Sequence, residues 1–263
     1  MKKIIAGNWK FNKQLRNKDR AREFIEKLEK EIAGIENTEV KVFPHNLVLP
    51  YLAGKTKKVK LGAQDLHWTE DGSFTSAQFS ACDITNLGVK QVLIGHSETR
   101  FYFGVDEKKV ALKLKAALKE GILPIICIGE DIKEKEEGKT KQVLEKQIKE
   151  GILPALAEFS AESKPEFLIG YEPIYAIAGF AKLRGKEPKS ARIEDIEFAH
   201  EVIRGVFSRA GYSGVKILYG GSSKPENAKE LLSQAFIDGL LVGTASWSLP
   251  SFLEMIRIAE NLG

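Results

Sequence analysis

Residues 167–178 read Phe-Leu-Ile-Gly-Tyr-Glu-Pro-Ile-Tyr-Ala-Ile-Ala. A short apolar run leads to a carboxylate, Glu172, and Pro173 follows at once. Proline has no backbone N–H to donate to a neighbouring strand, so it ends the run. The stretch therefore predicts a buried strand with a carboxylate at its tip. The Gly- and Lys-containing segment 178–190, which separates it from the next helix, predicts a flap.

Similar apolar runs recur along the chain, and longer amphipathic segments follow most of them. The expected strands are residues 4–7, 40–43, 59–63, 91–95, 124–128, 167–170, 216–219 and 240–242. The expected helices are residues 22–32, 107–120, 140–152, 193–207, 226–234 and 250–261. Such units predict an α/β protein with a parallel sheet covered by helices, closed into an eightfold β/α barrel. No linker divides the chain, so residues 1–263 are expected to form a single domain.

The composition is that of a globular protein, with 43% hydrophobic and 29% charged residues. No apolar run approaches the roughly 18 residues of a membrane span, and no secretory signal peptide is expected. Cys82 and Cys127 lack metal-ligand spacing and suit a reducing, cytoplasmic compartment. A net charge of +4 favours a small anionic substrate and is too low for a nucleic-acid surface.

In such a barrel the active site lies at the carboxyl ends of the strands. Asn8 and Lys10 follow the first strand, His96 and Glu98 the fourth, and Glu172 the sixth. A cation, an imidazole and a carboxylate are the groups that move protons beside a polarised carbonyl. Each has a plainer interpretation alone: a surface charge, a structural histidine, half of an ion pair. Their occurrence at the tips of one barrel favours catalysis.

Glycine-rich turns follow the last two strands. Ser222 comes after Gly-Gly, and Gly243 and Thr244 follow the eighth strand. Backbone N–H groups in such turns, near a helix start, can bind a phosphate dianion.

At this level of detail the sequence resembles the triosephosphate isomerase family. The resemblance runs nearly the whole chain, through Ala6-Gly-Asn-Trp-Lys-Phe-Asn12, Gly62-Ala-Gln64, Ile94-Gly-His-Ser-Glu98, Cys127-Ile-Gly-Glu130, Tyr171-Glu-Pro-Ile-Tyr-Ala-Ile177, Tyr219-Gly-Gly-Ser222 and Asp238-Gly-Leu-Leu-Val-Gly243. Seven segments in the family's order are far more specific than any one of them.

The resemblance implies a proton shuttle between adjacent carbons of a phosphorylated aldose and ketose. Glu172 would be the base, His96 a neutral electrophile, and Lys10 the cation that neutralises developing charge. Asn8 would orient Lys10, and Glu98 would pair with it. Backbone N–H groups of Ala178, Ser222, Gly243 and Thr244 would hold the phosphate. The resemblance implies no metal and no organic cofactor.

The flap departs from the family pattern. Residues 178–181 read Ala-Gly-Phe-Ala where the family has Gly-Thr-Gly-Lys, and the segment is longer by roughly eight residues. It carries Lys182, Arg184 and Lys186, which could face solvent or reach a bound anion. The first hinge of the flap, Pro173-Ile-Tyr175, has the residue types of the family pattern. The second hinge, at the end of the flap, is not recognisable from the sequence.

Three family charges of the dimer interface are replaced together, by Ala77, Thr99 and Val105. Losing one charge would leave its partner charge unpaired at the interface, whereas losing all three leaves a consistent uncharged patch. Thr75 is kept, so a homodimer through the loop around Thr75 is expected.

Two further departures leave the substrate open. Asp65 replaces an asparagine, with His67 and Trp68 after it, and Thr244 replaces a glycine in the eighth turn. Paralogues that isomerise four-carbon ketose phosphates share such features. Glyceraldehyde 3-phosphate and dihydroxyacetone phosphate are the first choice, a tetrulose phosphate the second, and a non-catalytic phosphosugar-binding barrel the third.

Overall fold

The computed structural model describes residues 2–69, 79–160, 163–177, 179–180 and 190–263. Eight parallel strands form one sheet in the order β3-β2-β1-β8-β7-β6-β5-β4. They are β1 (Lys3–Asn8), β2 (Thr38–Phe43), β3 (Lys60–Leu61), β4 (Gln91–Ile94), β5 (Leu123–Ile128), β6 (Leu168–Tyr171), β7 (Lys216–Tyr219) and β8 (Gly239–Val242).

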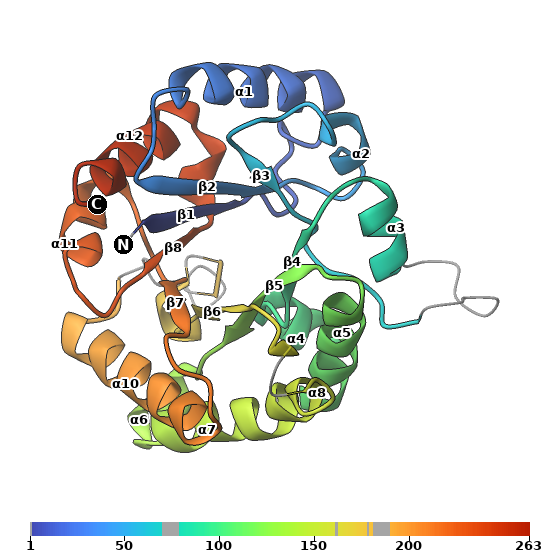
Figure 1. Cartoon of the computed structure of the whole chain (residues 1–263). Coiled ribbons are helices and arrows are strands. Elements are labelled where there is room, and N and C mark those ends of the chain that lie inside the picture. Colours follow the sequence, from blue (N-terminus) through green and yellow to red (C-terminus); the bar gives the residue numbers. More distant parts are fainter. Residues whose placement is uncertain (1, 70–78, 161–162, 178, 181–189) are drawn as a thin grey trace.

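The two edges of this sheet meet at Ala63. Its N–H donates to the Gln91 carbonyl at 2.9 Å, and its own carbonyl accepts from the Leu93 N–H at 2.9 Å. This parallel bridge between Ala63 and Val92 joins the β3 edge to β4. The predicted parallel β/α barrel is therefore confirmed, with the helices arranged outside the strands (Figure 1).

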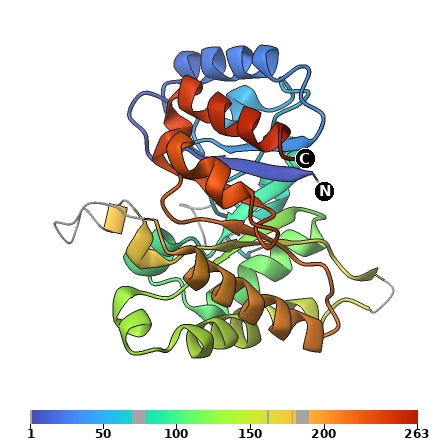
Figure 2. The same cartoon turned by 90° about the vertical axis from the view of Figure 1, so that its left-hand side faces the viewer.

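The longer helices cover the outside of the barrel, and shorter ones lie in the connections. The α-helices are α1 (Lys18–Glu31), α2 (Leu49–Leu52), α3 (Ala81–Asn86), α4 (Ser97–Phe103), α5 (Glu107–Lys119), α6 (Ile132–Glu136), α7 (Thr140–Gly151), α8 (Leu153–Leu156), α10 (Ile193–Arg209), α11 (Pro225–Leu232) and α12 (Leu249–Glu260). Two 3-10 turns, η2 (Ile174–Ala176) and η3 (Thr244–Trp247), follow β6 and β8. The last helix, α12, packs against β1, so the two ends of the sequence meet on one side of the barrel (Figure 2).

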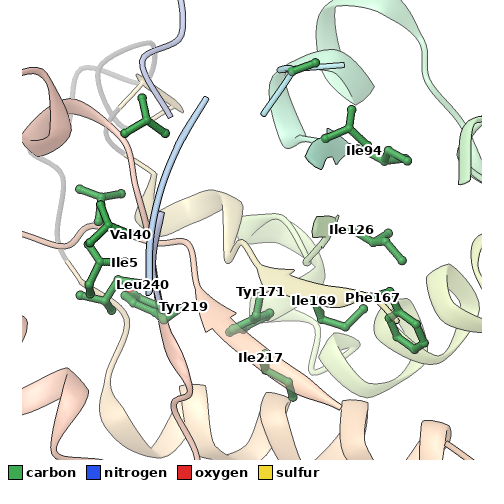
Figure 3. Packing of buried hydrophobic residues seen from close by; sticks show 14 of the residues in the cluster. Ile5, Val40, Ile94, Ile126, Phe167, Ile169, Tyr171, Ile217, Tyr219 and Leu240 are labelled. Atoms are coloured by element: carbon green, nitrogen blue, oxygen red, sulfur yellow. The ribbon is translucent and has the colours of Figure 1, made fainter. Parts of the chain in front are cut away.

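Alternation along the strands creates two apolar layers, because successive side chains point to opposite faces of a strand. Ile4, Ile125 and Leu241 belong to the cluster inside the barrel. The side chains that alternate with them belong to the layer between the strands and the helices, which includes Ile5, Ile126, Ile169, Ile217 and Leu240 of five neighbouring strands (Figure 3). Apolar side chains on both faces explain why the strands read as continuous apolar runs.

The predicted strand bounds differ from the observed ones mainly at β3. Residues 59–63 were expected to form a strand, but the ladder covers only Lys60 and Leu61. Beyond them the chain changes partner, because Gly62 still bonds to Val42 of β2 whereas Ala63 bonds to β4. Within the described ranges, no helix is both long and apolar enough to cross a bilayer.

Candidate active site

Lys10 follows β1 in a left-handed backbone conformation, with φ of 48°. A non-glycine side chain is disfavoured there. The conformation is held from both sides: the Lys10 N–H donates to Asn8 Oδ1 at 3.0 Å, and Gln64 Nε2 donates to the Lys10 carbonyl at 3.2 Å. The ammonium lies 2.7 Å from Glu98 Oε1, which is the pairing that the resemblance implied.

His96 stands at the N-cap of α4, directly after β4. Its Nδ1 accepts the Glu98 N–H at 3.2 Å, so the ring caps the helix and directs Nε2 away from it. Nε2 lies 3.1 Å from Glu172 Oε1. The ring is buried. Because Nδ1 acts as an acceptor, a neutral ring must carry its proton on Nε2.

Glu172 lies one residue beyond β6 and is 3% exposed. Its Oε2 accepts the Ser97 N–H, the first of α4, at 2.9 Å. Burial raises the pKa of this carboxyl, but the adjacent His96, the Ser97 N–H and the charge of Lys10 together outweigh burial. The pKa of Glu172 therefore lies below its ordinary value, and the group is a carboxylate at neutral pH.

These side chains open into one cavity of about 640 Å³ at the carboxyl ends of the strands. Its walls include five predicted side chains, Asn8, Lys10, His96, Glu98 and Glu172, and also Ser222, Gly243 and Thr244. Ala178, the remaining predicted residue, lies outside the described residues, as do Lys182, Arg184 and Lys186 of the flap.

The Ser222 N–H is engaged in this structure. It donates to the Ala176 carbonyl at 2.9 Å, so it is not free to hold an anion in this conformation. Thr244 starts η3, which follows β8.

Gly220 makes a close approach to the carboxylate. A Cβ added at this position would lie 2.8 Å from Glu172 Cγ, which real contacts avoid. The first glycine of the Gly-Gly turn is therefore required by the space that Glu172 occupies.

Two residues that the sequence analysis did not single out hold this end of the barrel. Arg100 of α4 donates to the Gly95 carbonyl at 2.8 Å and to Glu107 Oε1 at 2.8 Å, and so ties β4 to α5. The Tyr219 hydroxyl accepts the Ala191 N–H at 3.0 Å and bonds Ser190 Oγ at 3.1 Å. The end of the flap, which the sequence did not reveal, is thus anchored to β7.

The Asp65 departure also has a local partner. Asp65 Oδ2 lies 2.6 Å from the ammonium of Lys113, a side chain of α5 that is 6% exposed. His67 and Trp68 stack on each other, with ring centroids 4.1 Å apart. Asp65, His67 and Trp68 do not line the cavity. Within the described part of the chain, no three His, Cys, Asp or Glu side chains are placed to hold a metal ion.

The family model described as triosephosphate isomerase matches residues 3–259. The chain belongs to the triosephosphate isomerase family. Triosephosphate isomerase of Citrifermentans bemidjiense is 40% identical over 261 residues, covering 98% of this chain and 99% of that protein. The Carboxydothermus hydrogenoformans protein of that name is 39% identical over 258 residues, covering 97% and 98%.

A solved structure agrees with this assignment. Triosephosphate isomerase from Bartonella henselae superimposes with a TM-score of 0.79 at 29% identity, over 98% of this chain and 99% of that one. As a member of this family the chain is an enzyme, an isomerase.

Proposed function

We propose that this triosephosphate isomerase family member interconverts glyceraldehyde 3-phosphate and dihydroxyacetone phosphate through an enediolate, with Glu172 as base. The observation that carries the proposal is the contact between Glu172 Oε1 and His96 Nε2, 3.1 Å apart, in a cavity that also contains the Lys10 ammonium. Such a site can remove a proton from carbon while it polarises the adjacent carbonyl.

His96 acts as the neutral electrophile. Its Nδ1 accepts a backbone N–H of α4, and a helix N-terminus disfavours positive charge. The Nε2–H therefore hydrogen-bonds the substrate carbonyl oxygen. Glu172 takes the proton from the carbon beside the carbonyl, the hydroxyl on that carbon loses its proton as the carbonyl oxygen gains one, and Glu172 returns its proton to the other carbon.

Glu172 must move to do this, because its Oε2 is held by the Ser97 N–H at 2.9 Å. Substrate binding exchanges that hydrogen bond for contact with the carbon acid. The carboxylate then loses one of the groups that lower its pKa. Its basicity rises at the moment when a proton must be taken.

Lys10 and the last two turns hold the anion. Lys10 is oriented by Asn8 and paired with Glu98, and it neutralises charge on the enediolate and the phosphate. The N–H groups of Gly243 and Thr244, with Ser222 and Ala178, bind the phosphate. The Ser222 N–H must first leave the Ala176 carbonyl, so phosphate binding is coupled to a change in η2.

The test is Glu172→Gln, assayed with both triose phosphates. We expect kcat to fall on the order of 10²–10⁴-fold with little change in KM, because the base acts only in the transition state. Glu197→Gln, on the exposed face of α10, is the matched control and should keep full activity. Near-normal kcat for Glu172→Gln would overturn the role of Glu172.

Thr244 in the proposed phosphate turn keeps a tetrulose phosphate as the second candidate substrate. Parallel assays separate the two candidates: faster turnover of a tetrulose phosphate than of glyceraldehyde 3-phosphate would favour the second. A protein that binds the triose phosphates but turns over neither substrate would be a phosphosugar-binding barrel.

A homodimer in the cytoplasm, formed from a single catalytic domain of residues 1–263, completes the proposal. Thr75 and Ala77 lie outside the described residues, whereas Thr99 is half-buried in α4 and Val105 is buried. The support comes from large apolar side chains that α4 leaves exposed: Phe101 at 67%, Tyr102 at 56% and Phe103 at 70%. An exposed patch of this kind is typical of a protein interface.

A further inference from the structure

The active-site cavity continues beyond the turns proposed to hold the phosphate. Past Ser222 and Thr244 it extends between the first turns of α11 and α12, which pack against each other at the outside of the barrel (Figure 1). The walls of this extension are Ser223, Lys224, Glu226, Trp247, Ser248 and Ser251. None of these residues takes part in the proton shuttle.

Two buried hydrogen-bonding groups in these walls have no partner. They are the hydroxyl of Ser223, a residue that is 7% exposed, and the indole N–H of Trp247. Buried polar groups are nearly always hydrogen-bonded, so two unpaired ones among the residues that line one cavity call for an explanation. An indole N–H can only donate. The missing partner of the Trp247 indole is therefore an acceptor, such as an oxygen atom of a ligand.

The charges around the extension favour an oxyanion only weakly by themselves. Lys224 is offset by Glu226, two residues later. The N-termini of α11 and α12 add partial positive charge and direct N–H groups outward. Some of those groups are already used, since Asn227 Oδ1 accepts the Lys224 N–H and Ser248 Oγ accepts the Ser251 N–H. Directed donors, rather than net charge, therefore select the ligand.

We propose that the extension is a second oxyanion subsite. It takes the outer phosphoryl group of a diphosphate-bearing ligand whose inner phosphoryl group occupies the position proposed for the substrate phosphate. Such a ligand competes with the triose phosphate and inhibits the isomerase. The inference rests on the proposed function, because it uses the same phosphate position.

Inorganic pyrophosphate and orthophosphate are the probes, tested as competitive inhibitors of triose phosphate turnover at constant ionic strength with EDTA present. We expect the inhibition constant of pyrophosphate to be about tenfold lower than that of orthophosphate, equivalent to one added pair of good contacts. In the double variant Ser223→Ala, Trp247→Phe this advantage should disappear. Its orthophosphate inhibition and its kcat/KM for the triose phosphate should stay unchanged, which also shows that the variant folds.

Trp68→Phe is the control, because this indole lies outside the cavity, and it should keep the pyrophosphate advantage. Equal inhibition by the two anions, or an advantage that survives in the double variant, would overturn the subsite. Calorimetric titration with pyrophosphate distinguishes failure of the subsite from failure of the proposed function. If the protein does not turn over triose phosphates, tight pyrophosphate binding that the double variant loses still supports the subsite. Titration without such binding rejects it.

Discussion

At the scale of single residues, Lys10 is the side chain for which the backbone is least suited. Among the described residues it is the only non-glycine with a positive φ, at 48°. The left-handed conformation costs roughly 1–2 kcal/mol for such a residue. Asn8 and Gln64 hold it there, and the strain places the ammonium at Glu98.

Comparing Lys10→Gly with Lys10→Ala isolates this strain, because both remove the ammonium and only glycine accepts the backbone. We expect Lys10→Gly to be the more stable by roughly 0.5–1 kcal/mol in urea unfolding, after the greater chain entropy of glycine is subtracted. At Lys13, where φ is not positive, we expect Lys13→Ala to be more stable than Lys13→Gly. The same order at both positions would show that Lys10 is unstrained.

The sequence predicted that Lys10, His96 and Glu172 would lie together, because each follows an apolar run and parallel strands bring their ends together; all three line one cavity. It could not reveal the φ of Lys10, since nothing in the residue type marks it. Nor could it show that the Ser222 N–H is taken by Ala176, because that contact joins the turns of two different strands.

At the scale of elements, strands with apolar side chains on both faces were predictable to within one or two residues, as for β1 and β7. The end of the flap was not. Ser190 and Ala191 carry no recognisable motif, and their anchor is a tyrosine of β7 almost 30 positions away, at sequence separations of 29 and 28. Long-range hydrogen bonds of this kind leave no periodic signal.

Tyr219→Phe removes both of these hydrogen bonds while the ring remains packed. The Tyr219 side chain is fully buried beside the flap end, so the loss releases Ser190 and Ala191 without opening a cavity. We expect kcat/KM to fall by about tenfold, as the loss of about 1–1.5 kcal/mol of positioning predicts. The measurement is steady-state kinetics with glyceraldehyde 3-phosphate.

Tyr212→Phe is the matched control for Tyr219→Phe. The Tyr212 hydroxyl makes only a 3.5 Å contact with the Leu156 carbonyl, and neither residue lines the cavity, so its removal should leave kcat/KM unchanged. An equal effect of both substitutions would mean that Tyr219 does not position the flap.

At the scale of the whole molecule, the exposed aromatic side chains of α4 predict self-association. Phe103→Asp places a charge in an apolar patch that would be desolvated in the proposed dimer, so sedimentation velocity should find a dimer for the wild-type protein and monomers for the variant. Phe198→Asp on α10, where the phenylalanine is 46% exposed, should leave the dimer intact. A dimer that survives Phe103→Asp would place the interface elsewhere.

The opposite end of the barrel contains a buried cation, Lys41, which belongs to no proposed site. Its side chain is fully buried, 2.5 Å from Glu39 Oε1, and Lys60 lies 3.5 Å from the same oxygen. Burial lowers the pKa of Lys41 below its ordinary 10.5; Glu39 opposes this, and Lys60 and Lys216 add to it. Desolvating such a charge can outweigh its ion pair, so replacing both Lys41 and Glu39 with apolar side chains is expected to be neutral or stabilising, whereas removing Lys41 alone would leave Glu39 without its closest partner.

The pH dependence of unfolding tests this directly. Because the folded pKa of Lys41 is below the unfolded value, the native state releases its proton first as the pH rises toward 10.5. The unfolded state then binds more protons, and the wild-type protein gains stability in that window. The double variant Lys41→Met, Glu39→Leu lacks this gain. Its advantage, about 0–3 kcal/mol at pH 7, should therefore shrink in urea unfolding as the pH rises toward 10.5, by roughly 1.4 kcal/mol for each unit of pKa shift. The control Lys90→Met, at an exposed position, should follow the wild-type slope. A large loss of stability of the Lys41 and Glu39 double variant at pH 7 would show instead that the Lys41–Glu39 pair is net stabilising.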